Sequence, residues 1–249
     1  MIDEAEWAAQ SGFGVRLCWG TAGIRALADE VAALVVVDVL RFTTALDVAT
    51  AAGAVVRPAP WPLDRAQLPA GAAEVADGSG PRALSLSPAS LAALSAGDVI
   101  VLPSPNGSQS STVAATLCST VVGGCLRNAG AVARWVDDAS EGGAVGVVPC
   151  GETWPGGGLR PAVEDLLGAG AIVSELAGER SCSPEAAVAL AAFRAARPEI
   201  ASALAESASG RQLRDRGLED DLAWAGAVDV SECVPVLGAE GGYRDAQET

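Results

Sequence analysis

The sequence predicts a three-layer α/β/α fold around a largely parallel sheet, and it leaves open whether the sheet is mixed. Short runs of β-branched residues without polar breaks, such as 35–37, are typical of parallel strands covered on both faces. Stretches with helical character alternate with these runs. The 249 residues are enough for the core of one large α/β domain. Since no repeat or clear boundary is visible, we expect residues 1–249 to form a single domain.

The first elements follow from this pattern. Residues 1–30 are predicted to form an amphipathic lead-in that ends in a short helix at 24–29. A buried strand at 31–38, a helix near 43–52 and a strand at 54–58 come next. A strand, a helix and a second strand at this spacing predict a βαβ unit.

The rest of the chain continues the alternation. Further strands are expected at 74–76, 98–102, 120–124, 144–148 and 234–237. Further helices are expected at 63–67, 88–95, 109–118, 128–136, 161–176, 183–196 and 209–225. Ser87 as N-cap and Pro88 as first helical residue support the start of the helix at 88–95, and Asn128 is expected to open the helix at 128–136.

The composition indicates which binding partners and which cellular location to expect. The formal net charge of −15 argues against nucleic acid and against anionic membrane surfaces. No apolar stretch approaches the ~20 residues of a membrane helix, and the acidic start lacks a signal pattern. The six cysteines contain no Cys-x-x-Cys pair, so we expect reduced thiols and a cytoplasmic protein. A homodimer is compatible with the sequence, which specifies no oligomeric state.

The absence of two residue types excludes several mechanisms. There is no histidine, and every basic residue is an arginine. Ser-His-Asp and Cys-His nucleophiles, Walker lysines and Schiff bases are therefore impossible. No cysteine is followed by arginine six residues on, and the Asp38 segment lacks the Asp-x-Asp pattern of aspartyl-phosphate enzymes. Water activated on a metal ion is the route that this composition favours.

The first candidate site residues follow the strand at 31–38. Asp38 falls at its carboxyl end, and Arg41 comes three residues later. Ligands bind at this edge of open α/β sheets, where a carboxylate suits a metal ion and a guanidinium suits an anionic oxygen. The alternative is that Asp38 caps the next helix and pairs with Arg41. This segment alone does not decide between the two.

Two further loops follow predicted strands, at 104–108 and 150–165. In the first, Gly107 lets the backbone approach an anion, while Ser108 and the N–H groups of the next helix are expected to point outward as donors. The alternative is an ordinary turn with a serine cap. In the second, Glu164 and Asp165 begin a helix after a glycine-rich lead-in. They could hold a metal ion or simply favour the helix N-terminus.

Mg²⁺ suits this set better than zinc, because the candidate ligands are carboxylate oxygens and histidine is absent. Cys150 also lies at a strand end near the expected crevice. With no histidine to activate its thiol, we expect it to be a small packing residue and not a nucleophile.

Several short motifs in order resemble the 2-phosphosulfolactate phosphatase family. They are Asp38-Val39-Leu40-Arg41-x-Thr43-Thr44, Ser87-Pro88, Asn106-Gly107-Ser108, Asn128-Ala129, Glu164-Asp165, and Ser209-Gly210-Arg211-x-Leu213 with Asp221 downstream. The resemblance implies a three-layer α/β fold and Mg²⁺-dependent hydrolysis of the phosphate monoester of a small 2-hydroxy acid. In its archaeal setting that reaction belongs to coenzyme M synthesis.

The resemblance and the strand-end argument together give one predicted site. Catalysis is assigned to Asp38, Arg41, Glu164 and Asp165, Mg²⁺ binding to Asp38, Glu164 and Asp165, and binding of the phosphorylated anionic substrate to Arg41, Thr43, Asn106, Gly107, Ser108 and Asn128. Two loops depart from the family pattern, at 84–88 and 104–108. The alternative function is therefore a protein of the same fold that binds a phosphorylated metabolite without turning it over.

Overall fold

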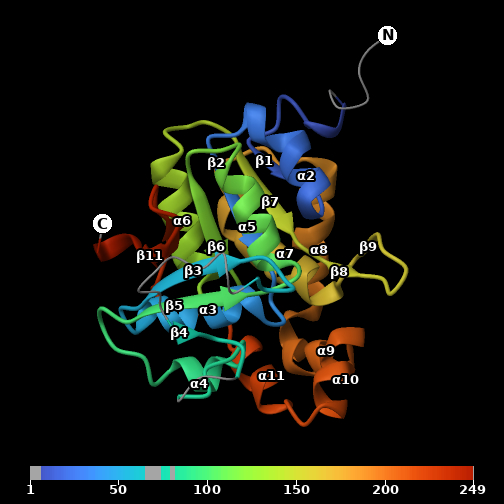
Figure 1. Ribbon diagram of the computed structural model, residues 1–249. Helices are drawn as coiled ribbons and strands as arrows, with labels where there is room; N and C mark the ends of the chain where they lie inside the picture. Colours follow the sequence, from blue (N-terminus) through green and yellow to red (C-terminus); the bar gives the residue numbers. More distant parts are fainter. Residues whose placement is uncertain (1–6, 65–73, 79–81, 249) are drawn as a thin grey trace.

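The computed structural model describes residues 7–64, 74–78 and 82–248 and confirms the three-layer α/β/α class (Figure 1). In this part of the chain a mixed sheet has the strand order β1-β7-β2-β6-β10-β11-β3-β5-β4. Its strands are β1 (Val15–Leu17), β2 (Ala33–Val37), β3 (Val55–Ala59), β4 (Glu74–Val75), β5 (Val99–Pro103), β6 (Val121–Gly124), β7 (Val145–Pro149), β10 (Pro235–Leu237) and β11 (Tyr243–Asp245). A separate small hairpin contains β8 (Glu152–Thr153) and β9 (Leu159–Arg160).

Helices cover both faces of the sheet. They are α2 (Gly20–Leu27), α3 (Phe42–Ala51), α4 (Pro88–Leu91), α5 (Gly107–Ala115), α6 (Ala129–Ala139), α7 (Val163–Leu176), α8 (Pro184–Ala196), α9 (Ile200–Glu206), α10 (Ala208–Asp215) and α11 (Asp220–Ala225). Short 3₁₀ turns occupy Ala28–Glu30, Arg197–Glu199 and Ala246–Glu248. Among the described residues, no helix has both the length and the apolar character needed to cross a membrane.

The sheet consists of two parallel halves that run in opposite directions. Strands β1, β7, β2 and β6 pair in parallel, and so do β3, β5 and β4. The β10–β11 hairpin lies between the halves and pairs antiparallel with β6 on one side and β3 on the other. The predicted βαβ unit over 31–58 is therefore wrong, because β2 and β3 belong to different halves. Local sequence does not reveal a hairpin that the chain inserts almost two hundred residues later.

Strand β2 shows that the sheet is buried on both faces. Val35 and Val37 pack into the core beneath α6, α7 and α8, whereas Leu34 and Val36 pack into the core beneath α2, α3 and α5. All four side chains are fully buried. A strand covered on both faces needs no polar alternation, which is why the uninterrupted apolar run predicted it correctly.

Several other predictions need correction. The amphipathic lead-in contains strand β1, and helix α2 begins at Gly20, earlier than expected. Helix α4 ends at Leu91, and helix α9 was not predicted. The helix predicted at 209–225 is two helices, α10 and α11, because Gly217 takes a positive φ between them. The helix predicted at 63–67 falls mostly outside the described residues.

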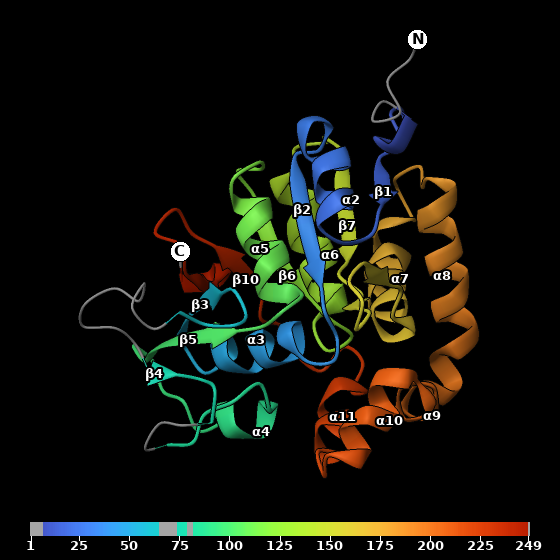
Figure 2. The ribbon, with the colours of Figure 1, turned by 45° about the vertical axis from the view of Figure 1, so that its right-hand side comes forward.

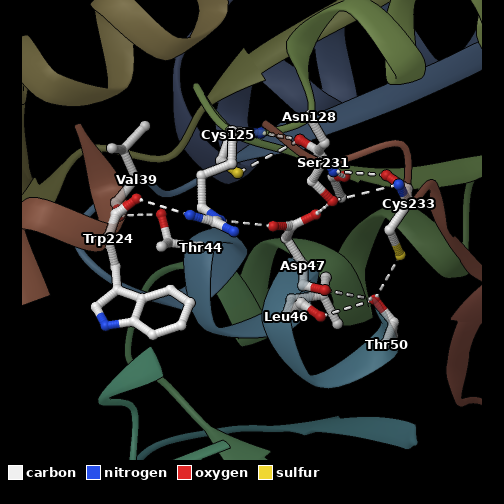
Figure 3. A network of polar contacts seen from close by, with 12 residues as sticks. Val39, Thr44, Leu46, Asp47, Thr50, Cys125, Asn128, Trp224, Ser231 and Cys233 are labelled. Atoms are coloured by element: carbon white, nitrogen blue, oxygen red, sulfur yellow. Dashed lines mark hydrogen bonds and ion pairs between the residues drawn. The ribbon is translucent and has the colours of Figure 1, made fainter. Parts of the chain in front are cut away.

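One polar network fixes helix α3 to the rest of the molecule (Figure 3). Asp47, in the middle of α3, is fully buried. Its carboxylate accepts hydrogen bonds from Arg127 Nε at 2.8 Å and from Ser231 Oγ at 2.6 Å. Arg127 also donates to the backbone oxygen of Trp224 and stacks over its ring. We call these four residues the Asp47 network, and it ties α3 to segments that follow β6 and α11.

Candidate active site

The loops that follow β2, β5 and β7 meet in the structure, as the sequence predicted. The backbone N–H of Gly107, at the start of α5, donates to Asp38 Oδ2 at 2.8 Å. Asn106, also after β5, donates to Glu152 after β7 at 2.9 Å. Figures 1 and 2 show the carboxyl ends of β2 and β5 leading toward the same central region, with α10 and α11 below it. Opposite strand directions therefore do not prevent the two half-sheets from sharing one site.

Asp38 joins two helix N-termini. Its Oδ1 accepts from Phe42 N of α3, while its Oδ2 accepts from Gly107 N of α5. A Cβ at position 107 would lie 2.7 Å from the Asp38 carboxylate and 2.3 Å from the Phe42 ring, so only glycine permits this approach. The hydroxyl of buried Thr43 bonds both backbone groups of Asp38. Thr43 thus holds Asp38 in place.

The neighbouring acids of α7 have different surroundings. Asp165 accepts from Val39 N with one oxygen and from Gly151 N with the other, both at 2.8 Å. Through these two hydrogen bonds Asp165 connects the ends of β2 and β7 to α7. Glu164 is 2% exposed, yet it accepts no hydrogen bond from the described residues. Of the pair, Glu164 has the free carboxylate oxygens.

Four carboxylates interact in this region: Asp38, Glu152, Glu164 and Asp165, which we call the Asp38 cluster. Burial raises the pKa of Asp38 to about 7, and repulsion from Glu152 and Glu164 adds to the effect. Burial also raises the pKa of Glu152, and it raises that of Asp165 well above its usual range with help from Asp38. Within the described residues, no three acidic or thiol side chains are already gathered as a metal-binding group.

Arg41 pairs with Asp221, and not with Asp38 as one reading of the sequence suggested. Arg41 Nη1 lies 2.6 Å from Asp221 Oδ2, and the two side chains are 16% and 2% exposed. Ser87 Oγ donates to the other Asp221 oxygen at 2.5 Å. Ser87 is the N-cap residue of α4, as predicted, but its hydroxyl bonds Asp221 and not a backbone N–H of the helix. Asp221 thus fixes one side of the Arg41 guanidinium.

These elements enclose a cavity of about 250 Å³. Its lining residues include Asp38, Arg41, Ser104, Asn106 and Glu152, together with Ser209, Gln212 and Arg216 from the α10 region. A second cavity, of about 320 Å³, shares Asn106 and Glu152 with the first and reaches Cys150. Glu152 and Arg216 were not predicted as site residues. Only the position of Glu152 after a predicted strand could have indicated it.

Four predicted substrate-binding residues do not line the cavity of Asp38 and Arg41: Thr43, Gly107, Ser108 and Asn128. Of these, Thr43 and Gly107 bond Asp38 instead. Helix α5 begins at Gly107, so Ser108 lies inside its first turn, fully buried, and donates to the oxygen of Leu102 at 2.7 Å. Its hydroxyl points inward, and the prediction that it points outward is wrong. Asn128 is fully buried too, and its amide bonds the backbone of Cys125 and Cys233 near the Asp47 network (Figure 3).

Cys150 is placed as a packing residue. It is 4% exposed, in the core that includes α2, α3 and α5. Burial raises the pKa of its thiol well above the usual value, and the negative charge of Asp38 adds to this. A thiolate is the nucleophilic form of cysteine, so this environment disfavours covalent chemistry at Cys150.

Comparison with known proteins identifies the family. The model of the 2-phosphosulpholactate phosphatase family matches residues 81–240, well over half of the chain. The chain belongs to this family. The matched residues contain the loop after β5, Glu152, the Glu164–Asp165 pair and helix α10, whereas Asp38 and Arg41 lie upstream of them.

Two curated relatives agree with membership of the 2-phosphosulpholactate phosphatase family. A Thermus thermophilus protein named "Probable 2-phosphosulfolactate phosphatase" is 35% identical over 150 residues, which cover 59% of this chain and 60% of that protein. A Methanothermobacter thermautotrophicus protein named "2-phosphosulfolactate phosphatase" is 31% identical over 151 residues, covering 61% and 58%. The chain thus spans about three-fifths of the length of each relative.

Proposed function

We propose that this protein hydrolyses the phosphate monoester of a small 2-hydroxy acid, 2-phosphosulfolactate or a close relative. The observation that carries the proposal is the cavity at the ends of β2, β5 and β7, which is lined by Arg41, Asp38 and Glu152. The other two acids of the Asp38 cluster interact electrostatically with Asp38. The names of the two curated relatives support the choice of substrate. A cytoplasmic location, a role in coenzyme M synthesis, a homodimeric state and the lack of a nucleic-acid partner belong to the same proposal.

We further propose that Mg²⁺ is the cofactor. The residues fit such an ion in their chemistry, because the charge of Glu164 raises the pKa of Asp38, Glu152 and Asp165, and Glu164 has no hydrogen-bond donor among the described residues. Asp38 and Glu164 would hold it. Asp165 would support them, since both of its oxygens already accept backbone hydrogen bonds. When bound, the ion supplies Lewis-acid polarisation of the phosphoryl group and of a water molecule.

The chain's own residues bind and orient the phosphate in this proposal. Asp221 holds Arg41 through Nη1, which leaves the other guanidinium donors for phosphoryl oxygens. Asn106 lines the cavity with its amide fixed by Glu152. The N–H of Gly107 already donates to Asp38, so Gly107 orders the site and does not donate to the substrate.

Turnover of 2-phosphosulfolactate, 2-phospholactate and p-nitrophenyl phosphate, with Mg²⁺ and with EDTA, tests the proposal. We expect Mg²⁺-dependent phosphate release that is lost in Glu164→Gln and kept in Glu175→Gln. Glu175 is a matched control because it is an exposed residue of the same helix. Calorimetric binding of the esters without phosphate release would favour the alternative, a binding protein. Equal activity in EDTA would contradict the metal assignment.

A further inference from the structure

One arginine that lines the cavity has no role in the proposed reaction. Arg216 is the C-cap residue directly after α10, and its side chain is exposed. It lines the same cavity as Asp38 and Arg41. Its guanidinium forms no hydrogen bond or ion pair with any residue that the structure describes. By contrast, Arg214, two residues earlier, pairs with Glu206 of α9 at 3.2 Å.

The other charged residues that line the cavity do not balance the charge of Arg216. The cations that line it are Arg41 and Arg216, and its acids include Asp38 and Glu152. Asp221 already balances the charge of Arg41 at 2.6 Å. Arg216 is therefore the lining cation, among the described residues, whose charge is not matched by an ion pair. In a chain with a net charge of −15, such a position favours an anionic ligand.

A neighbouring arginine shows what a structural role looks like here. Arg160 reaches the cavity wall by donating to Ser209 at 3.2 Å, and its guanidinium stacks over Trp154. Those contacts fix Arg160 without any ligand. Arg216 has no comparable contact, so packing does not explain why a guanidinium lies at this wall.

We propose that Arg216 binds an acidic group of the substrate other than its phosphate, and thereby selects phosphate esters that carry a second anion. This inference rests on the proposed function and deepens it. A guanidinium presents paired donors to a planar or three-oxygen anion, so a carboxylate or a sulfonate fits equally well. Arg216 binds and orients this group and forms no covalent bond, so it determines specificity and is not a catalytic residue.

Steady-state kinetics of Arg216→Gln, Arg216→Lys and Arg211→Gln test the inference. Arg211 is the matched control, since it is exposed on the same helix and does not line the cavity. For 2-phosphosulfolactate, Arg216→Gln should raise KM by about tenfold or more with little change in kcat, because a charge-assisted hydrogen bond is lost. Arg216→Lys should recover part of the loss. For p-nitrophenyl phosphate, which has no second anion, KM should not change.

The choice of esters separates the two acidic groups. If the effect of Arg216→Gln persists for 2-phospholactate, which lacks the sulfonate, Arg216 binds the carboxylate; if it disappears, Arg216 binds the sulfonate. Unchanged KM values for all esters, or an equal rise for p-nitrophenyl phosphate, would overturn the inference while leaving the phosphatase activity established.

Binding of sulfolactate, which has both acidic groups and no phosphate, gives a readout that does not need turnover. By calorimetry we expect weaker binding in Arg216→Gln than in the wild type and in Arg211→Gln. If no ester is hydrolysed, the proposed function fails, and this measurement still decides the inference. Equal sulfolactate binding in all three proteins, or none in the wild type, contradicts it.

Discussion

The Asp38 cluster and the Asp47 network contain buried aspartates only nine residues apart, one directly after β2 and one in the middle of α3. Burial raises the pKa of both. Arg127 and Ser231 satisfy Asp47 from within the chain. Asp38 receives only backbone N–H groups and a weak Ser104 contact, and its charged neighbours are acids. The chain thus supplies a counter-charge to Asp47, which has a structural role, and supplies none to Asp38, which the proposed function assigns to a bound cation.

The strongest test of this difference is Asp38→Asn. Loss of the carboxylate should lower kcat/KM by about a hundredfold to a thousandfold, which is the usual effect of removing a central electrostatic group. The fold should persist, since asparagine keeps one acceptor for the helix N–H groups. Phosphate release and far-UV circular dichroism measure the two effects. Undiminished activity would remove Asp38 from the mechanism.

Asp47→Asn should have the opposite effect: it should lower stability and leave activity nearly unchanged. Removing one partner of a buried ion pair costs about 3 kcal/mol, because Arg127 remains without its counter-charge. We expect a lower midpoint in urea unfolding and nearly normal kcat for the molecules that stay folded. If kcat falls while the midpoint is unchanged, the network takes part in the site and the comparison fails.

The pH dependence of stability sharpens the comparison. Between pH 4 and about 7, folded Asp38 retains a proton that the unfolded chain releases, because its pKa rises from 3.8 to about 7. Its contribution to stability is thus complete below pH 4 and is lost as pH rises through 7. Metal-free wild type should lose stability across this range relative to Asp38→Asn. Added Mg²⁺ should oppose the loss only in the wild type. Parallel urea-unfolding profiles for the two proteins would contradict this.

Arg41→Lys tests how the fixed guanidinium is used. Lysine can keep the charge pair with Asp221 but not the paired donors, so kcat/KM should fall by about tenfold with stability little changed. Kinetics at saturating Mg²⁺ measure this. If lysine works as well as arginine, Arg41 serves only to anchor Asp221.

The smallest effect is expected from Cys150→Ala. The raised pKa of this thiol keeps it protonated, so most activity should remain, and alkylation should inhibit only through added bulk. A complete loss of phosphate release, with Mg²⁺ and substrate still bound, would indicate a covalent mechanism at Cys150.

The sequence by itself determined the fold class and the region of the site. The apolar run of β2 predicts burial on both faces because each of its side chains needs an apolar neighbour, and Asp38 then falls at a strand end. Motif order led to the family, and the absence of histidine and lysine excluded whole mechanisms. These conclusions depend on local pattern and chemical identity, which the sequence displays directly.

Only the tertiary structure decided which polar groups are free. The sequence predicts Asp165 and Ser108 as ligand-binding residues. In the structure both Asp165 oxygens accept backbone N–H groups, and the Ser108 hydroxyl donates to the backbone oxygen of Leu102. Arg41 pairs with an aspartate 180 residues away. Arg216 reaches the cavity because α10 lies below the ends of oppositely running half-sheets (Figure 2). These partners come from distant segments of the chain. Which polar groups already have a hydrogen-bond partner therefore depends on how those segments pack.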